Sequence, residues 1–311
     1  MHRPLGSCTG GHSAGNLLRG VLRGALPTLS SVENLLDKGK FAELLEDLDL
    51  PRPWTLISAD PALIDSIGAE WNGLFLKPRD SFAFARRFSV KGFQIESRSE
   101  ARRLLHECHS AGLKMMAQEF IPGDPSAHHF LDGFMDRQGN ITAIMARRRV
   151  RAVDGPLSDT GCTVTIDLSL MREPAAQLKR LLRSIDYRGL FSAEFKLDPR
   201  DNQFKFIEVN TRVWSNIALA FACGVDLMGM LHRDALGLEV VSAGPYRVGQ
   251  HWVNIFRDCG AARKMVRARQ LSWTSFARSW MGAVYDLFAV DDPGPFFCEV
   301  KRRLGLRLRR G

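Results

Sequence analysis

The stretch FSAEFKLDPRDNQFKFIEVNTR, residues 191–212, contains two runs in which apolar and polar residues alternate. The first run covers residues 191–197 and the second covers residues 204–210, and a turn rich in Asp, Asn and Pro separates them. Two alternating runs joined by turn residues predict a β-hairpin. Successive side chains of a strand point to opposite faces of the sheet, so antiparallel pairing can place Glu194 near Glu208 and Asn210.

Two carboxylates and an amide oxygen would form a cluster of hard oxygen donors. Mg²⁺ prefers such ligands, especially where nucleotide phosphates complete its octahedral shell. The alternative is that these side chains are simply the solvated face of an ordinary hairpin. Spacing alone leaves both interpretations open, and the rest of the chain has to decide between them.

The composition is that of a globular protein with a preference for anionic partners. The chain has 311 residues, of which 45% are hydrophobic and 25% charged, enough for one large domain or two. Its net charge of +9 suits a nucleotide, a phosphorylated substrate, a nucleic acid or an anionic membrane. No nucleic-acid-binding motif accompanies this charge, and stacking aromatics are not interleaved with the basic residues. We therefore expect no nucleic-acid partner.

Cysteine usage and hydropathy indicate a cytoplasmic protein. The six cysteines are scattered, without the spacing of a metal site, which favours free thiols in a reducing compartment. The N-terminus shows no apolar run typical of a signal peptide. No uncharged apolar run approaches the ~18 residues that a membrane-spanning helix needs.

The N-terminal third of the chain predicts a flexible segment followed by short elements. Residues 1–30 are rich in Gly, Ser and Arg and lack periodicity, which favours a flexible tail over a phosphate loop. A capping box at Ser30 and Glu33 begins a leucine-rich region with an interruption at residues 38–40, which predicts two short helices. A short helix is expected at residues 61–67, and a longer one, with a capping box, at residues 97–112.

Cationic residues occur on several of the predicted strands. Lys77 ends the apolar strand expected at residues 73–78, and Lys91 lies in the strand expected at residues 88–95. Lys77 could bind phosphate, although a strand-end lysine can also simply reach solvent. In the run RRRVR, residues 147–151, alternation places Arg147, Arg149 and Arg151 on one face. These arginines form either a phosphate clamp or the exposed face of an edge strand.

Residues 241–311 carry less decisive patterns. An aromatic-rich helix is expected at residues 272–285, and a basic amphipathic helix at residues 296–308. The basic helix either packs with a frayed end or contacts an anionic membrane surface or an acidic partner.

In their order and spacing, these segments resemble the ATP-grasp superfamily, and within it the carboxylate–amine ligases of the D-aspartate ligase-like branch. The resemblance covers residues 35–240 and is carried by LFLKP at 74–78, VKGFQIESRSEARRLL at 90–105, QEFIPGD at 118–124, FMDRQGNITAIMARRRVR at 134–151 and YRGLFSAEFKLDPRDNQFKFIEVNTR at 187–212. It implies an α+β fold with two α+β lobes and the nucleotide between them. The N-terminal α/β domain of such ligases is expected to be shortened or absent, because only 76 residues precede Lys77.

The resemblance also implies a domain division and a set of site residues. Residues 1–30 would be the flexible segment, residues 31–240 the ATP-grasp domain and residues 241–311 a C-terminal extension. The residues expected to bind the nucleotide are Lys77, Lys91 and Arg151 at the phosphates, Gln118, Glu119, Phe120 and Ile121 at adenine, and Asp124 at the ribose. The expected ligands of Mg²⁺, or alternatively Mn²⁺, are Glu194, Glu208 and Asn210. The residues expected to act on the reacting groups are Arg149 and Arg212.

The implied activity is an ATP- and Mg²⁺-dependent ligase that joins a small-molecule carboxylate to an amine through an acyl phosphate. The alternative is an ATP-binding protein that is catalytically incomplete without a partner chain or a further domain. A homo-oligomer is left open by the sequence. Two departures from the family pattern stand out: the glycine-poor loop at residues 80–84, and Thr211 in place of a proline.

Overall fold

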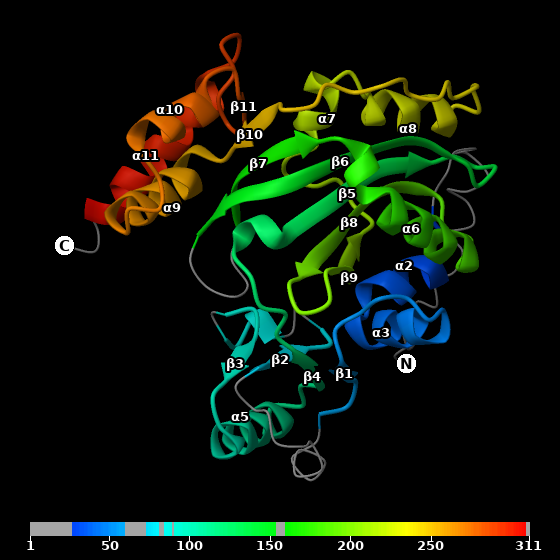
Figure 1. The fold of residues 1–311 in the computed structure, drawn as a ribbon, viewed down its shortest axis with the longest axis vertical. Helices are drawn as coiled ribbons and strands as arrows, with labels where there is room; N and C mark the ends of the chain where they lie inside the picture. The colour runs from blue at the N-terminus through cyan, green and yellow to red at the C-terminus, as the bar shows by residue number, and fades with distance from the viewer. Residues whose placement is uncertain (1–26, 60–72, 81–83, 89, 154–158, 309–311) are drawn as a thin grey trace, which may run out of the picture.

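The computed structural model describes residues 27–59, 73–80, 84–88, 90–153 and 159–308. Two β-sheets form its framework, one of four strands in the order β1-β4-β2-β3 and one of seven strands in the order β11-β10-β7-β6-β5-β8-β9 (Figure 1). Most of the segment predicted to be flexible, and the helix expected at residues 61–67, lie outside the described residues.

The four-stranded sheet forms the smaller lobe. Its strands are antiparallel and are backed by helix α5; the elements are β1 (Thr55–Leu56), β2 (Leu74–Pro78), β3 (Phe93–Ile95), β4 (Met115–Glu119) and α5 (Arg98–Ser110). The Ser97 half of the predicted capping box of α5 is confirmed, because Ser97 Oγ accepts from the backbone N–H of Glu100 at 3.2 Å. The Glu100 carboxylate accepts from the N–H of Glu96 at 3.0 Å, one residue before the N-cap. The placement of Lys91 in a strand is wrong, because β3 begins at Phe93 and Lys91 lies in the preceding loop.

The seven-stranded sheet forms the larger lobe and contains the predicted hairpin. Its pairs are antiparallel except β10 with β11. The strands are β5 (His128–Met135), β6 (Ile141–Ala152), β7 (Thr160–Ile166), β8 (Gly189–Asp198), β9 (Gln203–Asn210), β10 (His251–Val253) and β11 (Val284–Tyr285). The pairing of β8 with β9 confirms the hairpin from which the metal site was predicted.

Helices cover both faces of the large sheet with apolar contacts. One face packs against α2 (Leu29–Leu36), α3 (Lys38–Asp47) and α6 (Arg172–Ser184), and the other against α7 (Ala218–Ala222) and α8 (Leu227–Ala235). Two 3₁₀ turns, η3 (Pro125–Ala127) and η4 (Leu168–Met171), flank the sheet strands. Figure 1 shows α7 and α8 above the sheet, with α2 and α3 near its β9 edge.

The two predicted N-terminal helices are confirmed, but their caps differ from the prediction. The first helix starts one residue before Ser30, and its cap is Thr28, whose Oγ1 accepts from the backbone N–H of Ser31 at 3.0 Å. The break falls at Asp37, which caps α3 by accepting from the N–H groups of Gly39 at 2.8 Å and Lys40 at 3.1 Å. Residues 38–40 are therefore the first turn of α3 rather than an interruption, because an Asp side chain satisfies the open N–H groups there.

Residues 241–311 add β10 and β11 to the large sheet and place three helices beside them. These helices are α9 (Ile255–Arg267), α10 (Trp273–Trp280) and α11 (Gly294–Leu308), and they lie together at the β11 end of the sheet (Figure 1). The division of the chain at residue 240 stays a prediction. Within the described ranges, no helix combines the length and the apolar character needed to span a membrane.

Candidate active site

A cleft of about 1630 Å³ lies between the two sheets and is lined by residues of both lobes. Eleven of the thirteen residues predicted to bind nucleotide, metal or substrate line it: Lys77, Lys91, Gln118, Glu119, Phe120, Ile121, Arg149, Glu194, Glu208, Asn210 and Arg212. The structure therefore gathers residues from segments more than a hundred positions apart around one space.

A β-bulge brings the two predicted metal carboxylates to the same side of the hairpin. Phe195 pairs with Phe206 and Glu194 pairs with Glu208, so Ile207 is the extra residue in β9. An extra residue reverses the alternation that follows it. Phe206 therefore enters the core, with its ring centroid 4.4 Å from that of Phe195, while Glu208 faces the cleft.

Glu194 is held as a carboxylate by two neighbours. His128 Nδ1 lies 2.6 Å from Glu194 Oε1, and Arg149 Nη2 donates to the same oxygen at 3.1 Å. Burial alone would raise the pKa of Glu194, but the hydrogen bond from His128 and the charge of Arg149 outweigh it and bring the pKa to about 2. Burial lowers the pKa of His128, which favours a neutral imidazole with its proton on Nδ1.

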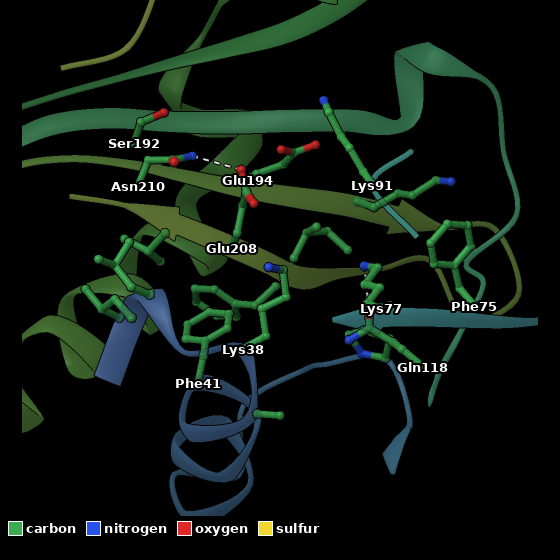
Figure 2. A pocket seen from close by; sticks show the side chains of 18 of the residues that line it. Lys38, Phe41, Phe75, Lys77, Lys91, Gln118, Ser192, Glu194, Glu208 and Asn210 are labelled. Atoms are coloured by element: carbon green, nitrogen blue, oxygen red, sulfur yellow. Dashed lines mark hydrogen bonds between the residues drawn. The ribbon is translucent and has the colours of Figure 1, made fainter. Parts of the chain in front are cut away.

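Glu208 is in the opposite situation. Burial, followed by the charge of Glu194, raises its pKa. Asn210 Nδ2 donates to Glu208 Oε1 at 2.9 Å, as Figure 2 shows. A pair of facing carboxylates of this kind is stabilised when a cation binds between them.

These side chains fit a magnesium ion by their chemistry. Two carboxylates and an amide oxygen are hard donors, and a nucleotide would supply further oxygens. In the described part of the chain no three His, Cys, Asp or Glu side chains cluster as a metal site. A metal here would thus depend on the Asn210 amide and on oxygens from ligands as well as on the two carboxylates.

Besides the predicted Lys77 and Lys91, the cleft is lined by Lys38, which was not predicted as a site residue. Lys77 Nζ donates to Gln118 Oε1 at 2.7 Å, and burial lowers the pKa of Lys77 to about 8 against the opposing charge of Glu208. Lys38 extends from the first turn of α3 beside Glu208, whose charge opposes the lowering of the Lys38 pKa by burial (Figure 2). The Asp37 cap was the available sequence signal, since it places Lys38 at the start of a helix.

The linker between the lobes is braced by charged side chains of the large lobe. Lys196 Nζ donates to the carbonyl of Ile121 at 2.5 Å and lies 4.6 Å from the ring centroid of Phe120. Glu119 accepts from the backbone N–H of Trp54 at 2.9 Å and from Arg200 at 2.9 Å. The Glu119 carboxylate therefore ties the linker to both lobes.

Two predicted nucleotide-binding residues lie away from the cleft lining. Arg151 donates to the two carboxylate oxygens of Asp258 at 2.8 and 2.7 Å and to Ser279 Oγ at 2.8 Å. Its partner in β7 is Cys162 while that of Arg149 is Thr163, so Val150 is an extra residue and turns Arg151 to the other face. Asp124 caps η3, accepting from the N–H of Ser126 at 2.6 Å.

The expectation that all three arginines share one face is therefore wrong for Arg151. The exposed-edge alternative is also wrong, because β6 lies between β5 and β7 and the three guanidinium groups are buried. Arg147 also lines the cleft but pairs with Asp132 at 2.6 Å, whereas Arg149 donates to Glu194 of the hairpin at 3.1 Å.

Comparison with known proteins identifies the fold. A family model described as the ATP binding domain of the carbamoyl-phosphate synthase L chain matches residues 159–242. A D-aspartate ligase from Enterococcus faecium is 31% identical over 214 residues, which is 66% of this chain and 51% of the relative. The chain belongs to the ATP-grasp superfamily.

Other relatives are more distant. The C-terminal section of the carbamoyl phosphate synthase large chain of Methanopyrus kandleri is 23% identical over 250 residues, 76% of this chain and 45% of the relative. This ATP-grasp chain thus spans about half the length of the curated relatives that it matches.

Solved structures confirm the predicted ATP-grasp architecture. A biotin carboxylase from Campylobacter jejuni superposes with a TM-score of 0.57 at 17% identity, covering 72% of this chain and 51% of that one. An L-amino acid ligase from Bacillus licheniformis superposes with a TM-score of 0.51 at 17% identity, covering 68% and 50%. The α+β fold of two lobes around a cleft was therefore predicted correctly.

Proposed function

We propose that this protein is an ATP- and Mg²⁺-dependent ligase that joins a small-molecule carboxylate to an amine. The observation that carries the proposal is the facing pair Glu194 and Glu208, with Asn210 beside them, in a cleft that also holds Lys77 and Arg149. The similarity to a D-aspartate ligase and the fold of an L-amino acid ligase support this reaction class.

The chemistry required of the protein is mainly the placement of charge. An oxygen of the substrate carboxylate attacks the γ-phosphorus, the bond to the β–γ bridging oxygen breaks, and ADP leaves. The amine nitrogen then attacks the carbonyl carbon of the acyl phosphate, inorganic phosphate leaves, and the amine loses a proton. When bound, Mg²⁺ neutralises phosphate charge, and the residues that would hold it are Glu194, Glu208 and Asn210.

The other side chains of the cleft act on the reacting groups directly. Lys77 would bind nucleotide phosphate, and its position is set by the hydrogen bond to Gln118. Arg149 holds Glu194 ionised and would stabilise charge on the transferred phosphoryl group. Arg212 lies at the cleft wall after Asn210 and would bind phosphate or the reacting carboxylate.

Several narrower expectations belong with this proposal. The cysteines of the described part are free, which agrees with a cytoplasmic protein; they are Cys108, Cys162, Cys223, Cys259 and Cys298. The use of Mn²⁺, a homo-oligomeric state, the absence of a nucleic-acid partner, and contact of the basic helix α11 with an anionic membrane or acidic partner stay predictions.

The reaction can be tested by trapping the acyl phosphate with hydroxylamine in place of the amine. The first acids to test are D-aspartate and L-amino acids, because the relatives are named for them. We expect hydroxamate and ADP to form only with ATP, Mg²⁺ and the acid. Glu208→Gln should abolish both products, whereas Glu173→Gln, at an exposed glutamate of α6, should leave them unchanged.

Two other results would change this conclusion. Full turnover by Glu208→Gln would exclude the metal site. Binding of a non-hydrolysable ATP analogue without product from any acid would favour the alternative of an ATP-binding protein that needs a partner chain.

A further inference from the structure

Asp159 links two cations that come from different parts of the chain. Lys91 Nζ of the small lobe lies 2.6 Å from Asp159 Oδ1, and Arg257 Nη2 of α9 lies 3.2 Å from Asp159 Oδ2. All three side chains line the cleft and remain partly exposed. The ion pairs therefore cross the mouth of the cleft from the small lobe to the C-terminal extension.

A third cation lies next to this carboxylate. Arg149 Nε donates to Thr160 Oγ1 at 3.0 Å, and Thr160 follows Asp159 in the chain. The charges of Lys91, Arg257 and Arg149 hold the pKa of Asp159 below its ordinary value, although burial opposes them. Three cations around one carboxylate at a cleft wall are an arrangement that also suits a phosphate group.

The position of Arg257 is fixed by the start of α9. Asn254 caps this helix, accepting through Oδ1 from the N–H of Arg257 at 2.9 Å, and its own N–H donates to the carbonyl of Gly161 at 2.8 Å. The helix start lies so close to β7 that a Cβ on Gly161 would come within 3.0 Å of the Asp258 Cα. Arg151 of β6 also pairs with Asp258, so the first turn of α9 is anchored to two neighbouring strands, β6 and β7.

We propose that Arg257 is a phosphate-binding residue of the nucleotide site, and that the Asp159 carboxylate occupies the place of the phosphates until the nucleotide enters. This proposal rests on the proposed function, because it needs ATP in the cleft. Arg257 lies beyond residue 242, where the match to the family model ends. The C-terminal extension thus supplies a part of the nucleotide site.

The test compares a ligand that has phosphates with one that has none. Affinities for AMPPNP with Mg²⁺ and for adenosine are measured on the full chain by calorimetry and ligand-observed NMR. Arg257→Ala should weaken AMPPNP binding tenfold or more and leave adenosine binding unchanged, while Arg257→Lys should recover part of the loss. Arg263→Ala, at an exposed arginine of the same helix, is the matched control and should change neither affinity.

Asp159→Asn is the second variant to test, because it should strengthen AMPPNP binding whereas Arg257→Ala should weaken it. With the competing charge removed, AMPPNP should bind several-fold more tightly, and adenosine binding should not change. Circular dichroism and the melting temperature show whether each variant is folded. If Arg257→Ala is folded and binds AMPPNP like the parent, the role of Arg257 is refuted.

The remaining outcomes are also decisive. If Asp159→Asn weakens AMPPNP binding, Asp159 is part of the site's scaffold and does not hold the place of the phosphates. If the parent chain binds neither ligand, the proposed function fails and this assignment fails with it. If the parent binds AMPPNP and Arg257→Ala binds it equally well, the role of Arg257 is refuted while the proposed function stands.

Discussion

The buried ion pair between β6 and α9 allows a quantitative prediction. Asp258 accepts from Arg151 through both carboxylate oxygens, at 2.8 and 2.7 Å, and from the indole N–H of Trp280 at 2.7 Å. The side chains of Asp258 and Arg151 are 0% and 2% exposed, so water cannot replace a lost partner. Asp258→Ala would leave the guanidinium buried with only Ser279 as a partner among these contacts.

The expected cost follows from that burial. Removing one partner of a buried ion pair typically costs about 3–5 kcal/mol, because the remaining charge stays desolvated. For 311 residues, an unfolding entropy of about 2.1 cal/mol/K per residue converts this cost into a decrease in Tm of about 5–8 °C. Replacing both partners with apolar residues, as in Arg151→Met with Asp258→Leu, should cost less than the single change.

Urea unfolding at neutral pH, followed by circular dichroism, measures these free energies. Asp291→Ala, at an exposed aspartate in the turn before α11, is the control and should change the free energy of unfolding by less than about 0.5 kcal/mol. A loss for Asp258→Ala as small as that of the control would refute the reasoning. So would a double variant that is less stable than the single one.

Three further predictions concern the hairpin. Glu208→Gln should abolish the rise in Tm that AMPPNP with Mg²⁺ causes in the parent, and an equal rise in both would contradict the metal assignment. The pKa of Glu194 falls from 4.5 to about 2 on folding, so its stabilisation is complete above pH 4.5 and is lost as the pH falls towards 2. Glu194→Gln should therefore flatten the pH dependence of the free energy of unfolding between pH 4.5 and about pH 2. An unchanged slope would contradict the lowered pKa of Glu194. Deleting Ile207 should remove the bulge but keep Glu208 opposite Glu194, because the residue that follows Phe206 in a regular antiparallel ladder faces the cleft. ATP-dependent activity should therefore persist, and its loss would contradict this account of the bulge.

Local sequence patterns were sufficient to predict the parts of the fold that depend on neighbouring residues. The hairpin of β8 and β9, the Ser97 cap of α5 and the two N-terminal helices follow from periodicity and from side chains within four positions of each other. The resemblance to ATP-grasp ligases gave the two-lobed architecture and most of the residues that line the cleft.

The errors and omissions depend on contacts between distant segments. Arg151 was assigned to the phosphates because alternation ignores the extra residue Val150 and the buried partner Asp258. His128 contacts Glu194 across two paired strands, and Arg257 reaches Asp159 from a helix nearly a hundred positions away. No pattern within one segment could show either contact.

The two bulged strands have a consequence for comparisons between relatives. The extra residues are Ile207 in β9 and Val150 in β6. Beyond each of them, the side chains point to the face opposite to the one that simple alternation predicts. One insertion exposes a carboxylate to the cleft, and the other withdraws a guanidinium from it. In relatives, therefore, the spacing of residues in the sequence does not by itself say which side chains face the cleft. A relative that lacks the extra residue would show a one-residue gap and still place the paired side chains on the same faces, whereas a relative with the same spacing and no bulge would turn them to the opposite faces.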